Sequence, residues 1–249
     1  MVVSTEKYTF RNSPIRIQRR VLNLVKLVMP YRRIKFTENV YYHICNRSVG
    51  SEKIFLNPLS LTRALELINF YKHESDIGFS HLSQLAPEIR AVRLNQIYNS
   101  PKRVEFLAFS LMPTHFHFVL RQLIDDGIIT FLTNFQNAYA KYYNIKFERH
   151  GSVFTNRFKA VIIESEAQLL HVIRYVELNP VSDRLIEIND LIDYPCTSFT
   201  TYMGKIIHPF INTEMILSYF KKTETYKQFV YNNADYQRQL QDIKNLLLE

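Results

Sequence analysis

The chain has 249 residues, 47% of them hydrophobic, and its formal net charge is +8. This composition is typical of a folded globular protein and argues against an intrinsically disordered chain. The positive charge favours an anionic partner, although a protein that is simply basic would show the same balance.

Two further features bear on where the protein resides. Cys45 and Cys196 are the only cysteines in the sequence, which argues against a disulfide framework and favours a reducing cytoplasm. No stretch approaches the roughly eighteen consecutive apolar residues of a membrane-spanning helix, and the first residues do not resemble a signal peptide. We therefore expect a cytoplasmic protein with no membrane partner.

Residues 13–33 combine basic side chains with apolar residues at helical spacing. The pattern predicts an amphipathic helix within an N-terminal extension that covers residues 1–35. Such a helix could dock on the main domain with its basic face in water, contact DNA, or mediate self-association. The spacing does not choose among these roles.

The rest of the chain alternates between strand and helix patterns. Strands are predicted over residues 36–46, 103–112, 115–121 and 152–164. Helices are predicted over residues 58–73, 128–145 and 165–180. Residues 74–100 look loop-rich, which indicates an insertion. The order of these elements predicts an α+β fold in which helices pack on an antiparallel sheet.

The residues that follow Pro113 are mostly aromatic or apolar, and two histidines stand among them. Because side chains alternate along a strand, His115 and His117 share one face while Phe116 points to the other. Two neighbouring imidazoles supply half of a divalent-metal site. Histidine pairs of this kind are also common without any metal, so the motif needs support from a second element.

The last predicted helix supplies that support. Ser165 and Gln168 form a capping box at its start, an apolar stripe follows at helical spacing, and Pro180 is expected to end it. Tyr175 and Asn179 lie one turn apart, beside the stripe. They could be ordinary boundary residues, or they could present a phenol and an amide oxygen to one site.

Taken together, these motifs resemble those of the HUH single-tyrosine transposases. The first motif is the segment Met112–His117, and the second is Arg174–Val181. Further similar stretches are Tyr41–Arg47, Arg149–Lys159 and Tyr194–Phe199. The resemblance covers roughly residues 36–205. It points to the branch of the REP-associated tyrosine transposases and related transposases of bacterial insertion sequences.

The chain departs from the family pattern at three places. Thr114 stands where asparagine or aspartate is usual, and Cys196 stands where tryptophan is frequent. The pair Thr155-Asn156 replaces the more usual Gln-Gly. None of these changes removes a group that the resemblance assigns to catalysis, but they leave open which DNA the protein selects.

The resemblance implies a ferredoxin-like variant of the HUH nuclease fold over residues 36–205. A C-terminal helical tail is expected over residues 206–249. It implies a DNA transposase that nicks and rejoins single-stranded DNA through a covalent 5′-phosphotyrosine and recognises hairpins of palindromic repeats. It also implies a homodimer, with active sites either shared between subunits or completed within each chain. No nucleotide cofactor is expected, because the covalent bond conserves the phosphodiester for rejoining.

The resemblance also assigns roles to individual residues. Tyr175 would be the nucleophile. A divalent ion, Mg²⁺ or Mn²⁺, would be bound by His115, His117 and Asn179. Basic residues near the motifs are candidates for phosphate contacts, namely Lys141, Arg149, Arg157 and Lys159. Each of these four could equally belong to a solvated basic face.

Several alternatives stay open at this point. Tyr139, Tyr142 and Tyr143 could compete for the role of nucleophile, although they also suit a helix that packs or stacks bases. His43 could approach the metal, but a hydrogen-bonded place in the sheet suits it better. The protein could also be a catalytically silent transposase derivative that binds structured nucleic acid, or a metallonuclease that uses water.

Overall fold

The computed structural model describes residues 35–239. The chain divides after Lys35, and residues 36–249 form the unit that contains the helices and strands described below. The predicted helix over residues 13–33 lies outside the described residues, as does the chain from residue 240 onward. Within the described part, no helix has the length and apolar character needed to cross a membrane.

Four strands form one sheet at the centre of this unit. They are β1 (Tyr41–Arg47), β2 (Val104–Met112), β3 (His115–Gln122) and β4 (Lys159–Ile163). The order across the sheet is β2-β3-β1-β4, and every neighbouring pair runs antiparallel. The predicted α+β fold with an antiparallel sheet is therefore confirmed, and β1 and β3 occupy the middle of the sheet.

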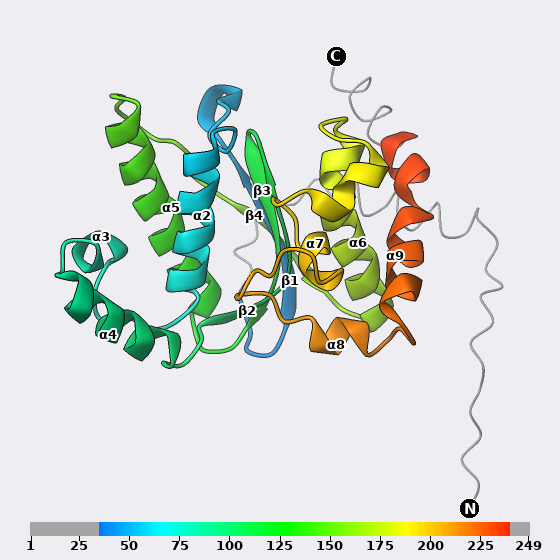
Figure 1. Ribbon diagram of the computed structural model, residues 1–249, viewed down its shortest axis with the longest axis horizontal. Helices are drawn as coiled ribbons and strands as arrows, with labels where there is room; N and C mark the ends of the chain where they lie inside the picture. Colours follow the sequence, from blue (N-terminus) through cyan, green and yellow to red (C-terminus); the bar gives the residue numbers. More distant parts are fainter. Residues whose placement is uncertain (1–34, 240–249) are drawn as a thin grey trace, which may run out of the picture. The chain divides into compact units, whose positions relative to one another are not determined.

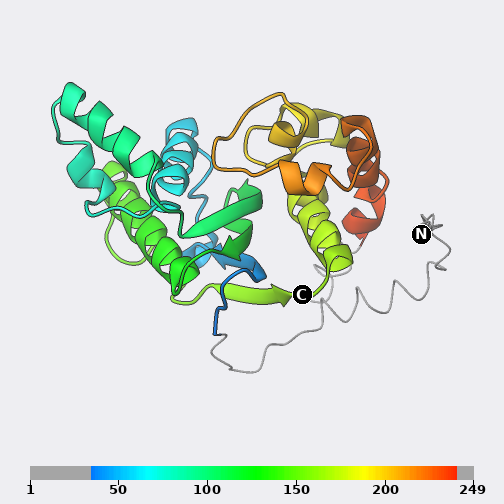
Figure 2. The same ribbon diagram turned by 90° about the horizontal axis from the view of Figure 1, so that it is seen from below.

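Helices cover both faces of the sheet, as Figures 1 and 2 show. One layer consists of α2 (Pro58–Tyr71) and α5 (Gly127–Lys146), with the shorter α3 (Phe79–Leu82) and α4 (Pro87–Tyr98) beyond them. The other layer is built around α6 (Glu166–Ser182) and includes α7 (Phe199–Tyr202), α8 (Glu214–Leu217) and α9 (Thr223–Tyr231). The described residues also contain two 3₁₀ turns, η1 (Val49–Ser51) and η2 (Ile188–Asp193).

The alternation of side chains along β3 explains why each face carries its own helical layer. Phe118 points toward α5, where its ring packs against Phe131 and Phe135 at centroid distances of 6.2 and 5.8 Å. Val119, the next residue, belongs instead to the core beneath α6. Aromatic side chains therefore fill one layer, while the other layer receives the face that carries the histidines.

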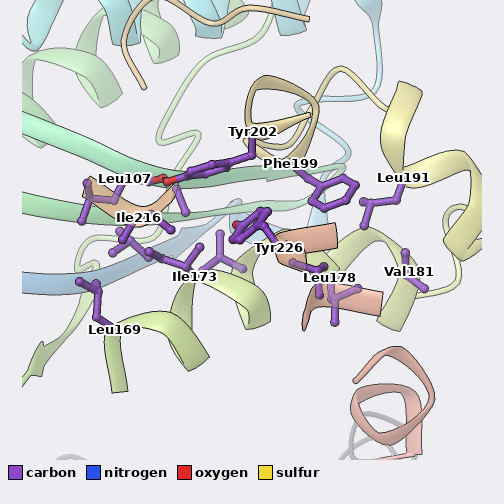
Figure 3. Packing of buried hydrophobic residues seen from close by; sticks show 14 of the residues in the cluster. Leu107, Leu169, Ile173, Leu178, Val181, Leu191, Phe199, Tyr202, Ile216 and Tyr226 are labelled. Carbon is purple, nitrogen blue, oxygen red and sulfur yellow. The ribbon is translucent and has the colours of Figure 1, made fainter. Parts of the chain in front are cut away.

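The core between the sheet and α6 holds the helix in place. Figure 3 shows side chains from β2, α6, η2, α7, α8 and α9, among them Leu107, Leu169, Ile173, Leu178, Val181, Leu191, Phe199, Tyr202, Ile216 and Tyr226. The hydroxyl of Tyr202 donates a hydrogen bond of 2.7 Å to the Leu107 carbonyl, which joins α7 to β2. Burial of this apolar surface fixes α6 against the sheet. Because α8 and α9 contribute side chains, the described chain from residue 206 to residue 239 takes part in the same core.

The expectation that residues 74–100 are loop-rich is wrong, because the segment contains α3 and α4. That the segment is an insertion stays a prediction. Most of its residues are exposed, so its apolar period is weak, and Leu82 and Ile97 are its buried anchors. Pro87 lies in the first turn of α4, where a missing N–H has no partner to lose. Arg93 also forms two hydrogen bonds of 2.7 Å with Asp76, which tie α4 to the preceding loop.

Two strands are shorter than predicted. Asn39 has a φ of 61°, in the left-handed region, so the chain turns there and β1 begins only at Tyr41. At the other end of the predicted range, Phe154 forms an isolated bridge with Ser48 and β4 begins only at Lys159. In both cases the apolar pattern extends beyond the hydrogen-bonded ladder.

Pro180 does not end α6 as predicted, and the helix continues to Ser182. A proline within a helix leaves the carbonyl four residues earlier without its N–H partner. Here that carbonyl belongs to Val176, and the side-chain amide of Asn179 donates a hydrogen bond of 3.3 Å to it. The Ser182 hydroxyl donates a further bond of 3.0 Å to the Leu178 carbonyl. These side-chain bonds stabilise the helix through the proline.

A buried carboxyl group links α6 to the elements that cover it. Glu177 is fully buried and accepts hydrogen bonds from the hydroxyls of Ser198, at 2.8 Å, and Tyr226, at 2.6 Å. Burial raises the pKa of Glu177 to about 8, although the two hydrogen bonds act to lower it. The carboxyl group is therefore largely protonated at neutral pH, and it joins α6, α9 and the start of α7 without a buried charge.

We expect Glu177→Gln to stay within about 1 kcal/mol of the wild-type free energy of unfolding at neutral pH, because a neutral amide can replace a neutral carboxyl group. Glu177→Ala should lose about 2–4 kcal/mol, since it leaves a cavity and two hydroxyls without their acceptor. Denaturant unfolding followed by circular dichroism measures both. Equal losses in the two variants would contradict a hydrogen-bonding role for Glu177.

Candidate active site

The two histidines of β3 face the α6 layer. His117 is 8% exposed and His115 is partly exposed, and both lie on the side of the sheet that carries Val119. Strand β1 runs beside them, with Cys45 opposite His117 and His43 opposite Val119. Directly opposed residues share a face of the sheet. The register therefore places His43 beside the histidine pair.

Hydrogen bonds hold both histidine rings of β3 by their Nδ1 atoms. His43 Nε2 lies 2.9 Å from His117 Nδ1, and the two rings are nearly parallel, with an interplanar angle of 13°. The Thr114 hydroxyl lies 3.1 Å from His115 Nδ1. Burial lowers the pKa of His43 to about 4, so this ring is neutral at physiological pH. The rings of His115 and His117 meet edge to face, with centroids 5.1 Å apart.

Tyr175 projects from α6 onto this group. Its ring centroid is 5.9 Å from that of His43 and 5.9 Å from that of His117, edge-on in each case. Burial raises the pKa of Tyr175 to about 12, and Cys45 and Asp183 act in the same direction. The phenol therefore keeps its proton at neutral pH. Because the tyrosine and the histidines belong to one chain, the group assembles without a second subunit.

Asn179 lies one turn beyond Tyr175 on α6, and Asp183 follows one turn later at the end of the helix. Asn179 is buried, and its amide nitrogen is held by the Val176 carbonyl. The amide oxygen is therefore the atom with which Asn179 would bind a hard cation. The assignment of Asn179 as a metal ligand stays a prediction.

The competing tyrosines lie in α5, across the sheet from the histidine face. Tyr139 is fully buried, and its hydroxyl donates a hydrogen bond of 2.6 Å to the Ile54 carbonyl. Tyr143 is buried too, and it donates a bond of 3.1 Å to Glu52. Tyr142 belongs to the same helix and is partly buried. These positions favour the tyrosine of α6 as the candidate nucleophile.

Positive charge lies on the same sheet face as the histidines. Lys159 begins β4 opposite Cys45, and Cys45 is in turn opposite His117, so all three share a face. Arg47, a residue without an assigned role in the sequence, lies opposite His115 at the end of β1. Both Lys159 and Arg47 are exposed. A polyanion could therefore approach the histidine pair from either flank.

The other basic residues named for phosphate contacts lie elsewhere. Arg157 is exposed just before β4, and Lys141 is exposed on α5, in the opposite layer. Arg149 follows α5 and forms an ion pair of 3.2 Å with Glu52, while its guanidinium lies 5.7 Å from the ring centroid of Tyr143. The structure thus gives Arg149 local partners, and the four residues do not form one cluster. Their contacts with DNA stay predictions.

Within residues 35–239, no group of three or more His, Cys, Asp or Glu side chains is arranged to hold a metal ion. A metal site here would instead combine two imidazoles with oxygen from an amide or from a phosphate. The residues present fit that combination, because a proton held at Nδ1 in these contacts would leave Nε2 of His115 and His117 as the ligand atom. Mn²⁺ accepts such a mixed set more readily than Mg²⁺ does.

The sequence assigns no role at the site to Thr114 or Asp183, and it leaves open only that His43 could approach a metal. Thr114 stands out there only as a departure from the family pattern. Asp183 follows the expected helix end at Pro180, and continuing the helical period of Asn179 by one turn finds it. The bond from His43 depends on the pairing of β1 with β3, for which the sequence carries no direct signal.

Comparison with solved structures finds transposases. One is a REP-associated tyrosine transposase bound to a REP hairpin, with 13% identity, a TM-score of 0.45, and coverage of 75% of this chain and 93% of that chain. Another is a candidate transposase from Deinococcus radiodurans R1, with 14% identity, a TM-score of 0.33, and coverage of 60% and 96%. No protein-family model and no curated protein matches the chain. At such low identities and TM-scores, function has to be inferred from this chain's own side chains.

Proposed function

We propose that this protein is a DNA transposase that nicks and rejoins single-stranded DNA through a covalent 5′-phosphotyrosine at Tyr175. The observation that carries the proposal is the position of Tyr175, whose ring lies 5.9 Å from those of both His43 and His117. Ile173 and Val176 anchor α6 in the core on either side of the tyrosine. The phenol is therefore held against the histidines by a rigid element, as a positioned nucleophile requires.

The proposed reaction transfers a phosphodiester from DNA to the protein and back. The hydroxyl oxygen of Tyr175 attacks the phosphorus, the bond from phosphorus to the 3′ oxygen breaks, and that oxygen leaves as a hydroxyl after taking up a proton. The 5′ phosphate is then joined to Tyr175. Attack by a 3′ hydroxyl reverses the step and restores the phenol, so the number of ester bonds is conserved and no nucleotide cofactor is needed.

The phenol needs activation before it can react. Its pKa of about 12 means that it is neutral at physiological pH, and a neutral phenol is a weak nucleophile. A divalent ion on His115, His117 and Asn179 would withdraw charge from a phosphate oxygen and favour the ionised phenol. We expect Mn²⁺ to serve at least as well as Mg²⁺, because imidazole suits Mn²⁺ better.

The proposed substrate is single-stranded DNA that folds into a hairpin. Lys159 and Arg47 supply positive charge on the histidine face, where the phosphate backbone would approach. Arg157, Lys141 and Arg149 are proposed as further contacts. Such contacts carry no sequence information, so choice among hairpins would come from exposed bases and shape. A homodimer is also part of the proposal, with a complete set of catalytic residues in each subunit.

Tyr175→Phe should abolish covalent attachment to DNA, because it removes the attacking oxygen and keeps the ring. The protein is incubated with single-stranded hairpin DNA and Mn²⁺, and the adduct is followed by denaturing electrophoresis and mapped by mass spectrometry. Wild-type protein should form an adduct at Tyr175. The variant should form none, yet should bind the hairpin as tightly as wild type.

Tyr142→Phe is the matched control, since Tyr142 is a partly buried tyrosine on the opposite side of the sheet. The Tyr142→Phe variant should form the adduct as wild type does. In the wild type, excess chelator should stop adduct formation. An adduct that persists in Tyr175→Phe would disprove the assignment. Hairpin binding without any adduct in the wild type would favour a catalytically silent binding protein, and cleavage without an adduct would favour water as the nucleophile.

Lys159→Gln should weaken the binding of single-stranded DNA at low salt. It should also reduce the slope of log affinity against log salt by about 0.7, the contribution of one phosphate contact. Arg149→Gln is the contrasting variant, and we expect a smaller change from it because Glu52 already pairs with Arg149. Fluorescence anisotropy over a salt series measures both. Identical slopes for wild type and Lys159→Gln would exclude Lys159 from the interface.

A further inference from the structure

We propose that His43 and Thr114 are positioning residues that hold His117 and His115 in the form that binds a divalent ion. The inference rests on the metal site of the proposed function. It adds to that site the hydrogen-bond partners of the two histidines. Neither His43 nor Thr114 would touch the ion. Each would act through the ring nitrogen of the histidine beside it.

An imidazole binds a cation through a nitrogen that carries no proton. An acceptor at the other ring nitrogen keeps the proton there and fixes the orientation of the ring. Both histidines have such a partner at Nδ1: His43 Nε2 lies 2.9 Å from His117, and the Thr114 hydroxyl lies 3.1 Å from His115. With Nδ1 as the donor in both contacts, the proton stays on Nδ1 and Nε2 is the ligand atom of each ring.

The fold holds both partners in place. β1 pairs with β3 over the full length of β1, so the separation of His43 and His117 follows from the backbone register. Thr114 lies in the turn between β2 and β3, and its carbonyl accepts a hydrogen bond of 2.8 Å from the backbone N–H of Ser48. The ring of Tyr175 covers both His43 and His117 edge-on. Rotation of the His43 or the His117 ring would therefore break both their hydrogen bond and a contact with the Tyr175 ring.

Thr114 also gives a physical reason for one departure from the family pattern. A threonine hydroxyl can accept a hydrogen bond, as can the side-chain oxygen of asparagine or aspartate. The threonine in this chain therefore keeps an oxygen acceptor immediately before the first histidine. On this view the position requires an acceptor for Nδ1 rather than an amide or a charge.

Binding of Mn²⁺ to the full chain without DNA tests the inference. His43→Phe keeps a ring of similar shape and removes the acceptor, while Thr114→Val keeps the shape of the side chain and removes its hydroxyl. Each variant should lower Mn²⁺ affinity by about 10–100-fold, the usual effect of removing such a partner. Isothermal titration calorimetry gives the affinity, and thermal unfolding without metal confirms that each variant is folded.

Conservative variants separate positioning from packing. His43→Gln offers an amide oxygen near the position of Nε2, and Thr114→Ser retains the hydroxyl. At equal thermal stability, both should bind Mn²⁺ more tightly than the phenylalanine and valine variants do. If His43 and Thr114 served packing alone, the variants that keep the side-chain shape would bind Mn²⁺ as tightly as those that keep the acceptor, or more tightly.

The outcomes distinguish this inference from the proposed function. Wild-type affinity in His43→Phe and Thr114→Val, with binding lost in His117→Ala, would overturn the inference and leave the metal site standing. Failure of the wild type to bind Mn²⁺ without DNA would overturn the inference, while adduct formation at Tyr175 would still decide the proposed function. A wild-type protein that forms the Tyr175 adduct while all positioning variants bind Mn²⁺ normally would keep the function and refute the positioning roles.

A second, independent inference concerns a cavity of about 340 Å³ away from the histidines, where the end of α2 meets the start of β2 and the loop before α8. We propose that this cavity binds a phosphate group through Lys72. The residues that line it are Lys72, Lys102, Val104, Glu105 and the segment 209–214.

Lys72 is only 5% exposed, and its ammonium group donates a hydrogen bond of 3.1 Å to the Pro209 carbonyl. Among residues 35–239 it forms no ion pair, and Glu105 at the cavity wall is already paired with Arg121 at 2.8 Å. Burial, with Lys102 as a second positive charge, lowers the pKa of Lys72 to about 8. A buried cation without an anion is unfavourable, and a bound phosphate would supply the missing charge.

Thermal unfolding in rising inorganic phosphate tests this site, with ionic strength kept constant by chloride. A ligand that binds the folded state raises the Tm, so the wild type should respond to phosphate. Lys72→Met keeps the aliphatic stem and should lose the response. Lys102→Gln changes an exposed residue at the rim, should respond less than wild type, and tests the site if Lys72→Met does not fold. Equal responses in wild type and the variants would overturn the proposal.

A free phosphate ion and a DNA phosphodiester share this chemistry, and a second arm of the experiment separates them. Fluorescence anisotropy gives the affinity of the same variants for single-stranded DNA. A weaker phosphate response with unchanged DNA affinity would support a site for the free ion. A parallel loss of DNA affinity would support a backbone phosphate as the occupant.

Discussion

The pairing of β1 with β3 is the constraint on which the candidate site depends. It sets His43 beside His117 at hydrogen-bond distance. The same register places Arg47 opposite His115. A slip by one residue would turn the histidine face toward α5, because side chains alternate along a strand. Since β1 and β3 are central strands with a helical layer on each face, such a slip would bury histidines among phenylalanines, and the register is strongly specified.

The second requirement is a helix that continues past a proline. Asn179 makes this possible. Its side-chain amide donates a hydrogen bond to the Val176 carbonyl, which would otherwise lack a partner because Pro180 has no N–H. Fixing the nitrogen also fixes which side of the amide carries the oxygen. The hydrogen bond that supports the helix through Pro180 thus also leaves the amide oxygen of Asn179 for the proposed chemistry.

The order of the elements and the two chemical motifs could be predicted because they depend on local patterns, alternation in β3 and a helical period in α6. The contact between His43 and His117 could not be predicted, because it joins β1 and β3. In the sequence these strands are separated by α2, α3, α4 and β2. The sequence does not indicate α4, because the exposed surface of this helix leaves too few apolar residues for a clear helical period. The predicted end at Pro180 failed because a single side chain, that of Asn179, satisfies the carbonyl that a proline normally leaves unpaired.

Burial makes the proposed nucleophile depend on its partners. A phenol in water has a pKa near 10, whereas burial, Cys45 and Asp183 raise the pKa of Tyr175 to about 12. The protein alone therefore makes this tyrosine less reactive than a free one, although the ring is already held beside His117. A cation bound by the histidines would act in the opposite direction and would also polarise the phosphate. The fold thus places the phenol, and a bound cation would favour its ionisation. Attack on a DNA strand would therefore require the folded site and the cation together.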